Sequence, residues 1–172
     1  MEKGSDQYLL FCPLDELEEY GFLYIRNQPC KIQTIDMMRT KDKYKKKKDD
    51  DIPERVRAQV KAHNAWTDEE VFDGTVTDDP VKVPKIDWEV YEAIFIDPKT
   101  SECRLMLEDS EDFEEIDDIK LPVEEKPKLV ELLRKDFSEA NEVNDRILVK
   151  VICMFDRKQI WEYSRERTDV SD

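Results

Sequence analysis

The sequence is poor in the residue types on which most enzymes and metal sites depend. It has one histidine and four widely spaced cysteines without a CxxC pair, at Cys12, Cys30, Cys103 and Cys153. A single imidazole leaves too few soft ligands for a zinc site, and cysteines in apolar strand patterns are typical of buried reduced thiols. The motifs GxGxxG, GxxxxGK[ST] and GxSxG are also absent. The sequence therefore predicts no enzyme activity, no metal site and no cofactor.

Long apolar segments are missing as well. No stretch approaches the ~20 apolar residues of a membrane-spanning helix, and the first residues have no apolar signal core. We therefore expect a soluble chain without a membrane partner, located in the cytoplasm, with the nucleus as an additional location.

Acidic residues outnumber basic ones, and charged residues make up 41% of the 172 residues. The formal net charge is −15, and it is distributed unevenly. Residues 85–172 hold 14 Lys and Arg against 25 Asp and Glu, a net of −11, whereas residues 1–84 hold 14 against 18, a net of −4. Such a chain is not suited to wrap a nucleic-acid duplex nonspecifically, because that requires neutralised phosphates.

Alternation of apolar and polar residues predicts two groups of strands. In the first group Gly21 opens a hairpin, Asn27 lies in its turn and Pro29 begins the second strand. The expected strands are 22–26, 30–36, 56–65 and 70–76. The second group has a turn at 97–100 and strands at 88–96, 103–107, 146–155 and 160–163. A helix is expected at about residues 126–137, with Leu129, Leu132, Leu133 and Phe137 at helical spacing.

This order of elements predicts a mainly β protein of two domains. We expect an SH3-like barrel over residues 8–84, followed by an OB-fold barrel over residues 85–166 with one short helix. Residues 1–7 and 167–172 are expected to be flexible tails.

Several motifs resemble the translation initiation factor 5A family of eukaryotes and archaea. Residues 21–32 read GFLYIRNQPCKI, and the family has the same GF and PCKI at the ends of this segment. Val83 and Pro84 match its domain junction, while residues 105–110 and 119–122 resemble its LSLLQDSG and LRLP. The resemblance covers residues 9–163. It implies an SH3-like and an OB domain that bind the ribosome beside the peptidyl tRNA and act in translation elongation, and we expect a monomer.

The sequence departs from the family in one loop, where family members carry a glycine-flanked lysine that becomes hypusine. Here the loop at residues 37–55 has no glycine and is longer. Lys41 and Lys43 both lie near the modified position, so neither is assigned as its equivalent. We therefore predict that the hypusine modification has been lost.

The same loop holds six lysines within residues 41–48, with Tyr44 among them. One interpretation is a cationic finger that contacts RNA phosphates, with Tyr44 stacked on a base. The other is a solvated loop whose lysines balance the aspartates at 49–51. The candidate RNA and ribosome contacts are Lys41, Lys43, Tyr44, Lys45, Lys46, Lys47 and Lys48.

A block at residues 108–118 contains eight carboxylates. It is either a solvated connection or a docking surface for a basic protein partner, with Glu111, Asp112, Phe113, Glu114 and Glu115 as candidate residues. Glu18 and Glu19 replace a basic pair of the family, which fits either surface drift or a lost phosphate contact. His63 falls on an expected strand, so we interpret it as a packed or half-buried side chain and not as a catalytic group.

Two functional hypotheses follow. The chain is either a factor 5A-like protein that binds ribosomes and RNA without hypusine, or a non-translational adaptor that recruits protein partners through its acidic C-terminal half. Sedimentation with ribosomes across a salt series separates the two.

Overall fold

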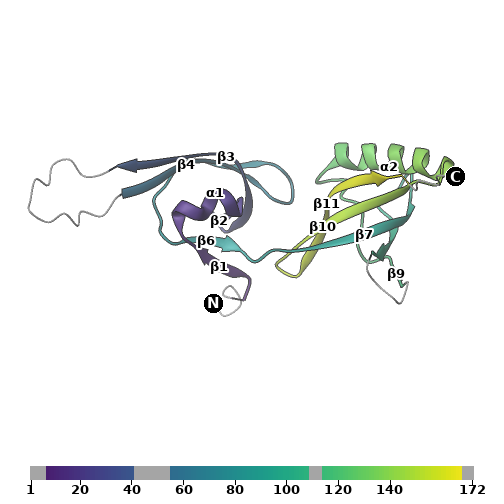
Figure 1. The fold of residues 1–172 in the computed structure, drawn as a ribbon, viewed down its shortest axis with the longest axis horizontal. Coiled ribbons are helices and arrows are strands. Elements are labelled where there is room, and N and C mark those ends of the chain that lie inside the picture. The colour runs from purple at the N-terminus through teal and green to yellow at the C-terminus, as the bar shows by residue number, and fades with distance from the viewer. Residues whose placement is uncertain (1–6, 41–54, 109–113, 168–172) are drawn as a thin grey trace, which may run out of the picture. The chain divides into compact units, whose positions relative to one another are not determined.

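The computed structural model describes residues 7–40, 55–108 and 114–167. Strands dominate these residues, so the predicted mainly β class is confirmed (Figure 1). The chain divides into two compact units, Met1–Lys85 and Ile86–Asp172. None of the helices in the described ranges has the length and apolar character of a membrane span.

The first unit contains a four-stranded antiparallel sheet in the order β2-β3-β4-β5. Its strands are β2 (Phe22–Ile25), β3 (Gln28–Thr40), β4 (Arg55–Asn64) and β5 (Glu70–Val76). Arg26 and Asn27 join β2 to β3 with φ angles of 53° and 62°. Two-residue hairpin turns of this kind need positive φ at both positions, and the expectation for Asn27 is confirmed. Pro29 lies in β3 opposite Tyr24.

A second, two-stranded ribbon pairs β1 (Leu9–Cys12) with β6 (Val81–Pro84). Between β1 and β2 the chain forms a 3₁₀ turn (Leu14–Glu16) and the short helix α1 (Leu17–Tyr20), which ends at Gly21. None of these elements was predicted from the sequence. Leu14 and Leu17 are fully buried, so this segment closes one side of the core. The core of the unit includes Leu14, Leu17, Leu23, Cys30, Val60 and Val83.

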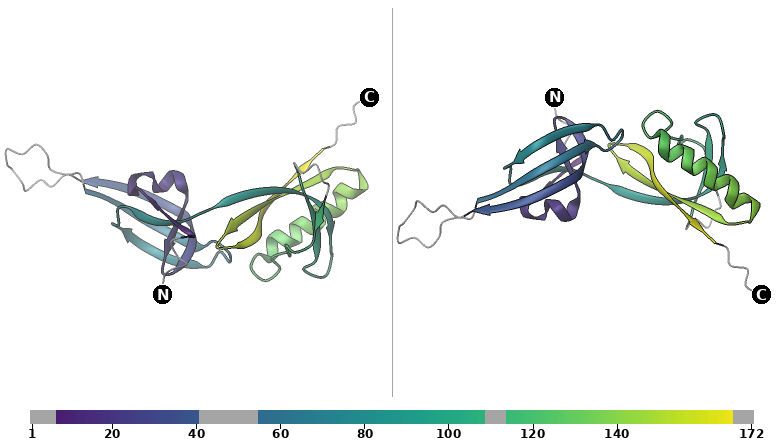
Figure 2. Two further views of the ribbon diagram at one scale, coloured as in Figure 1. Left: turned by 90° about the horizontal axis from the view of Figure 1, so that it is seen from below. Right: turned by 90° about the horizontal axis from the view of Figure 1, so that it is seen from above.

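The second unit is a five-stranded antiparallel sheet in the order β11-β10-β7-β8-β9. Its strands are β7 (Asp87–Ile96), β8 (Cys103–Leu107), β9 (Glu115–Ile116), β10 (Arg146–Met154) and β11 (Arg157–Glu166). The helix α2 (Pro127–Glu142) lies beside the sheet (Figures 1 and 2). The side chains of α2 that enter the core are Val130, Leu133, Phe137 and Ala140.

The helix therefore differs in two respects from the expectation. It continues to Glu142, and Leu132 is 55% exposed and does not join the core. Pro127 at its first turn is where proline is favoured, because the missing N–H has no partner there in any helix. Val130, Leu133, Phe137 and Ala140 share one helical face, whereas Leu132 lies on another.

The sheets are open, so the SH3-like and OB-fold barrels expected from the sequence are not closed barrels, although the overall fold class is as expected. Among the described strands, hydrogen bonding connects three separate sheets and closes none of them. In the second unit β9 has only two residues and pairs with β8 alone. Such a short strand offers too few backbone groups for a second ladder, so the five strands do not close on themselves.

Candidate nucleic-acid interface

The hairpin of β3 and β4 carries the predicted lysine-rich loop. Its pairing continues to Arg39 opposite Val56 and Thr40 opposite Arg55. The expected loop over residues 37–55 is therefore shorter, since residues 37–40 belong to β3 and Arg55 to β4. Strand pairing satisfies the backbone groups of these residues, which a loop would leave to water. The described ladder ends at the Thr40–Arg55 pair, and the segment 41–54 lies outside the described residues.

The predicted RNA contacts Lys41, Lys43, Tyr44, Lys45, Lys46, Lys47 and Lys48 all lie outside the described residues. The strands that flank them are described, and the exposed Arg39 and Arg57 lie near the end of the ladder. Residues 39–57 hold nine Lys and Arg against five Asp and Glu, which gives a net charge of +4. This end of the hairpin is therefore opposite in sign to the whole chain.

Hydrophobic packing holds the hairpin in the first unit. Ala58, Val60 and Ala62 alternate along β4 and are fully buried, while Gln59 is exposed. This is the period of two expected for a strand with one face in the core. A buried face fixes the register, because a slip by one residue would turn the apolar side chains to solvent. The positions of Thr40 and Arg55 are therefore set by the core.

A second group of basic and aromatic side chains lies in the second unit, and we call it the tryptophan–lysine cluster. The rings of Trp88 and Trp161 meet edge to face, with centroids 5.8 Å apart and planes at 71°. The ammonium of Lys150 lies 4.4 Å from the centroid of Trp88, and that of Lys126 lies 4.5 Å from the centroid of Trp161. Trp88 is 40% exposed. Indole rings and ammonium groups are the features with which proteins contact single-stranded nucleic acids.

A β-bulge helps to form this cluster. Lys150 pairs with Glu162, but Val151 pairs with Ile160, so Trp161 is the extra residue on β11. Lys150 also pairs with Val90 on β7, two residues from Trp88. Sequence analysis missed the cluster. Its residues come from β7, β10, β11 and the segment before α2, and they are far apart in the sequence, so no local pattern indicates the cluster.

Next to Trp88 on β7, the Glu89 carboxylate is the centre of a hydrogen-bonded group. It accepts a hydrogen bond from the Tyr91 hydroxyl at 2.8 Å and pairs with the Lys158 ammonium at 2.8 Å. The bond from Lys158 holds the pKa of Glu89 below its usual value. Burial, with the nearby Glu89, raises the pKa of Tyr91 to about 12 and that of the Cys153 thiol to about 11. These two groups therefore stay protonated near neutral pH and supply no nucleophile.

The acidic docking candidates are only partly described. Glu111, Asp112 and Phe113 lie outside the described residues, while Glu114 and Glu115 are exposed. Two carboxylates of the block have partners within the unit. A Glu115 oxygen lies 3.7 Å from Arg104, and a Glu108 oxygen lies 3.4 Å from Arg146. These two carboxylates are thus engaged in the fold.

Two further sequence interpretations can be compared with the structure. His63 on β4 is half-buried, as expected. Its Nε2 atom is buried without a hydrogen-bond partner among the described residues. Glu18 and Glu19 are exposed on α1, which leaves both of their interpretations open. In the described ranges no group of three His, Cys, Asp or Glu side chains is arranged to hold a metal ion.

Comparison with known proteins places this architecture in a class of two-domain β proteins. The sequence matches no protein-family model and no curated protein. Among solved structures, it is similar to a translation initiation factor 5A family protein from Naegleria fowleri, with a TM-score of 0.61 at 20% identity over 91% of this chain and 99% of that one. It is also similar to translation initiation factor 5A from Methanococcus jannaschii, with a TM-score of 0.55 at 15% identity over 91% and 95% of the two chains. The fold is that of factor 5A proteins, so the resemblance found in the sequence motifs is confirmed at the level of the fold.

Proposed function

We propose that this protein is a ribosome-binding translation factor of the factor 5A type, which contacts RNA through the lysines at residues 41–48. It acts in elongation, near the peptidyl tRNA, as a cytoplasmic monomer. The observation that supports this most is the β3–β4 ladder, which ends at the Thr40–Arg55 pair in a chain with the factor 5A fold. The most lysine-rich segment of the sequence is inserted at that pair.

Local charge supports contact with RNA in spite of the acidic composition. Residues 39–57 carry a net charge of +4, whereas the chain as a whole carries −15. At ~0.1 M salt, charges further apart than about 10 Å are largely screened from each other. A phosphate that meets the lysines directly is therefore attracted by them more than it is repelled by carboxylates elsewhere on the chain.

The tryptophan–lysine cluster gives the second unit a surface for an unpaired base. The Trp88 ring is partly exposed, and the ammonium of Lys150 lies above its face. A base that stacks on the indole would displace this ammonium, which could then pair with the phosphate of the same nucleotide. Base stacking on an aromatic side chain is worth about 1–3 kcal/mol. The cluster is thus suited, by itself, to bind an unpaired base.

The proposal is tested by replacing Lys45, Lys46, Lys47 and Lys48 with Gln and measuring co-sedimentation with ribosomes across a salt series. Four lost phosphate contacts should lower the slope of log affinity against log salt by about three. The matched control removes four exposed lysines elsewhere, at Lys85, Lys99, Lys128 and Lys135. The control changes the net charge equally and should keep the slope. An unchanged slope in the first variant, or an equal fall in both, contradicts the proposal.

We also propose that this factor works without hypusine. Neither Lys41 nor Lys43 is flanked by glycine, and glycine permits the close backbone approach that a modifying enzyme needs. Mass spectrometry of peptides covering residues 37–55, from protein made in eukaryotic cells, should show unmodified lysines at both positions. A hypusine mass increment on either lysine would refute this part of the proposal.

A further inference from the structure

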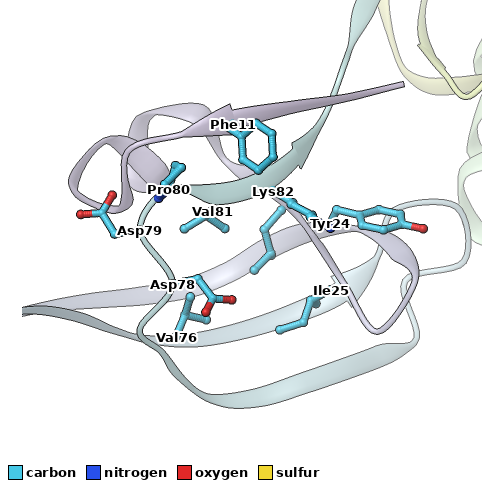
Figure 3. A pocket seen from close by; sticks show the side chains of 10 residues that line it. Phe11, Tyr24, Ile25, Val76, Asp78, Asp79, Pro80, Val81 and Lys82 are labelled. Carbon is cyan, nitrogen blue, oxygen red and sulfur yellow. The ribbon is translucent and has the colours of Figure 1, made fainter. Parts of the chain in front are cut away.

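A pocket in the first unit is not part of the proposed RNA contacts. It has a volume of about 410 Å³ and lies between the β1–β6 ribbon and strand β2 (Figure 3). Phe11 and Lys82 come from the ribbon, and Tyr24 and Ile25 come from β2. Pockets of about 300–1,000 Å³ hold small molecules or the side chains of a partner. The size of this pocket therefore suits one long side chain with its flanking backbone.

The pocket has an apolar base and an aromatic wall. Leu23, Val76 and Val81 line it and are almost fully buried, with exposed fractions of 1%, 5% and 3%. Phe11 is 65% exposed, the highest value among the large apolar side chains of the described residues. A phenylalanine ring at the mouth of the pocket offers a face to a flat or cationic group. Covering this exposed apolar ring with a ligand is also favourable, because it removes apolar surface from water.

The two carboxylates at the mouth differ in their partners. Asp79 accepts a hydrogen bond from the backbone N–H of Leu14 at 3.2 Å and turns away from Phe11 (Figure 3). Asp78 turns toward the pocket, and no other described residue forms an ion pair or hydrogen bond with its carboxylate. Asp78 is therefore a charge available to a ligand, whereas Asp79 is partly used to hold the connection between β5 and β6.

We propose that this pocket binds an arginine side chain from an extended segment of a basic protein partner. The planar guanidinium can stack on the Phe11 ring and pair with the Asp78 carboxylate, and its apolar stem can pack on Ile25 and Val81. An apolar side chain would leave Asp78 unpaired, and an anionic one would be repelled by it. The carboxylates of Asp78 and Asp79 both line the pocket, so they favour a basic segment at short range.

Lys82 allows a test in which a substitution should strengthen binding of the arginine instead of weakening it. It lines the same pocket and is exposed, and it forms no ion pair with Asp78 or Asp79. Its ammonium repels a cation in the pocket. Removing this charge should therefore strengthen arginine binding, although most substitutions in a binding site weaken it.

The experiment measures binding of the peptide acetyl-Ala-Val-Arg-Val-Ala-amide to the full chain by NMR, following the backbone amides of Tyr24, Ile25 and Val81. Replacing the peptide arginine by neutral citrulline should weaken binding about tenfold, because a charged hydrogen bond is lost. Asp78→Asn should weaken it about fivefold, as for a partly exposed ion pair. Lys82→Gln should tighten it, and Phe11→Ser should weaken it.

Asp73→Asn is the matched control, since Asp73 is exposed on β5 and does not line the pocket. It changes the net charge as Asp78→Asn does and should leave binding unchanged. Equal weakening by both variants would mean general attraction to an acidic chain and would overturn the proposal. The proposal would also be overturned if the citrulline peptide, or a peptide with leucine in place of arginine, bound as tightly as the arginine peptide. It would be overturned too if the peptide changed the chemical shifts of amides outside the pocket instead of those within it.

Discussion

Gly21 has a backbone conformation that only glycine adopts without strain, and replacing it should destabilise the first unit. It caps α1 with φ 84° and ψ −4°. A Cβ built at this position meets no atom within 4 Å, so an added methyl group has room. The whole penalty of Gly21→Ala is therefore conformational, and left-handed backbone costs an L-residue about 1–2 kcal/mol. We expect the free energy of unfolding to fall by about 1 kcal/mol, because alanine also restricts the unfolded chain.

Urea unfolding followed by circular dichroism measures this change as a shift in the midpoint at constant slope. Gly21→Asn should cost less than Gly21→Ala, because asparagine tolerates the left-handed region better. Gly74 provides a contrast, since it has no positive φ and its Cβ would meet the Phe72 ring at 3.1 Å. At Gly74 an added side chain is limited by space, whereas at Gly21 it is limited by backbone conformation. The stabilities of the Gly21 variants should therefore follow backbone preference and not side-chain size. Equal stability of the Ala variant and the natural chain, or an Asn variant weaker than Ala, would refute this reasoning.

Two further predictions concern the second unit. Leu133→Ala should lower the free energy of unfolding in urea by about 3 kcal/mol, because Leu133 is fully buried. Leu132→Ala should lower it by less than about 0.5 kcal/mol, because that side chain is 55% exposed. Equal losses for the two variants would contradict the assigned helix face. Raising the pH from 9 to 12 should lower the free energy of unfolding, since burial raises the pKa of Cys103 to about 11 and that of Tyr91 to about 12. The folded chain then keeps protons that the unfolded chain releases, which removes up to about 1.4 kcal/mol per pH unit for each group. Urea midpoints across this range should fall less in Cys103→Ala and Tyr91→Phe variants, and an unchanged fall would contradict this cause.

Turns could be predicted from the sequence because their signals lie within a few residues. The sequence places Asn27 in the hairpin turn, and its φ of 62° is the positive value that such a turn needs. The turn at residues 97–100 forms because the Asp97 carboxylate accepts hydrogen bonds from the backbone N–H groups of Lys99 and Thr100 at 2.8 and 2.9 Å. The long strands could be predicted for a related reason, since alternation over six or more residues records which face is buried.

The β1–β6 ribbon could not be predicted in this way. Leu9 pairs with Pro84 and Leu10 with Val83, so the partners lie at opposite ends of the unit. Each strand has four residues, too few for a pattern, and the pair Val83 and Pro84 was interpreted only as a boundary. The pairing depends on core residues that bring the two segments together. The pocket beside Phe11 was missed for the same reason, because it exists only where this ribbon meets β2.

The two candidate RNA-binding features, one in each unit, differ in the same way. The lysine-rich segment at residues 41–48 can be recognised from its amino-acid composition alone, without any knowledge of the fold. The tryptophan–lysine cluster instead depends on one extra residue. Ile160 and Tyr163 both pack against the core beside α2, although residues three apart in a regular strand face opposite sides. The bulge at Trp161 resolves this conflict, because the extra residue shifts the alternation and allows the Trp161 ring to meet Trp88. In a regular strand Trp161 would lie on the face opposite to that of Ile160 but on the same face as Tyr163, so alternation alone gives no consistent side for the residue that the cluster needs.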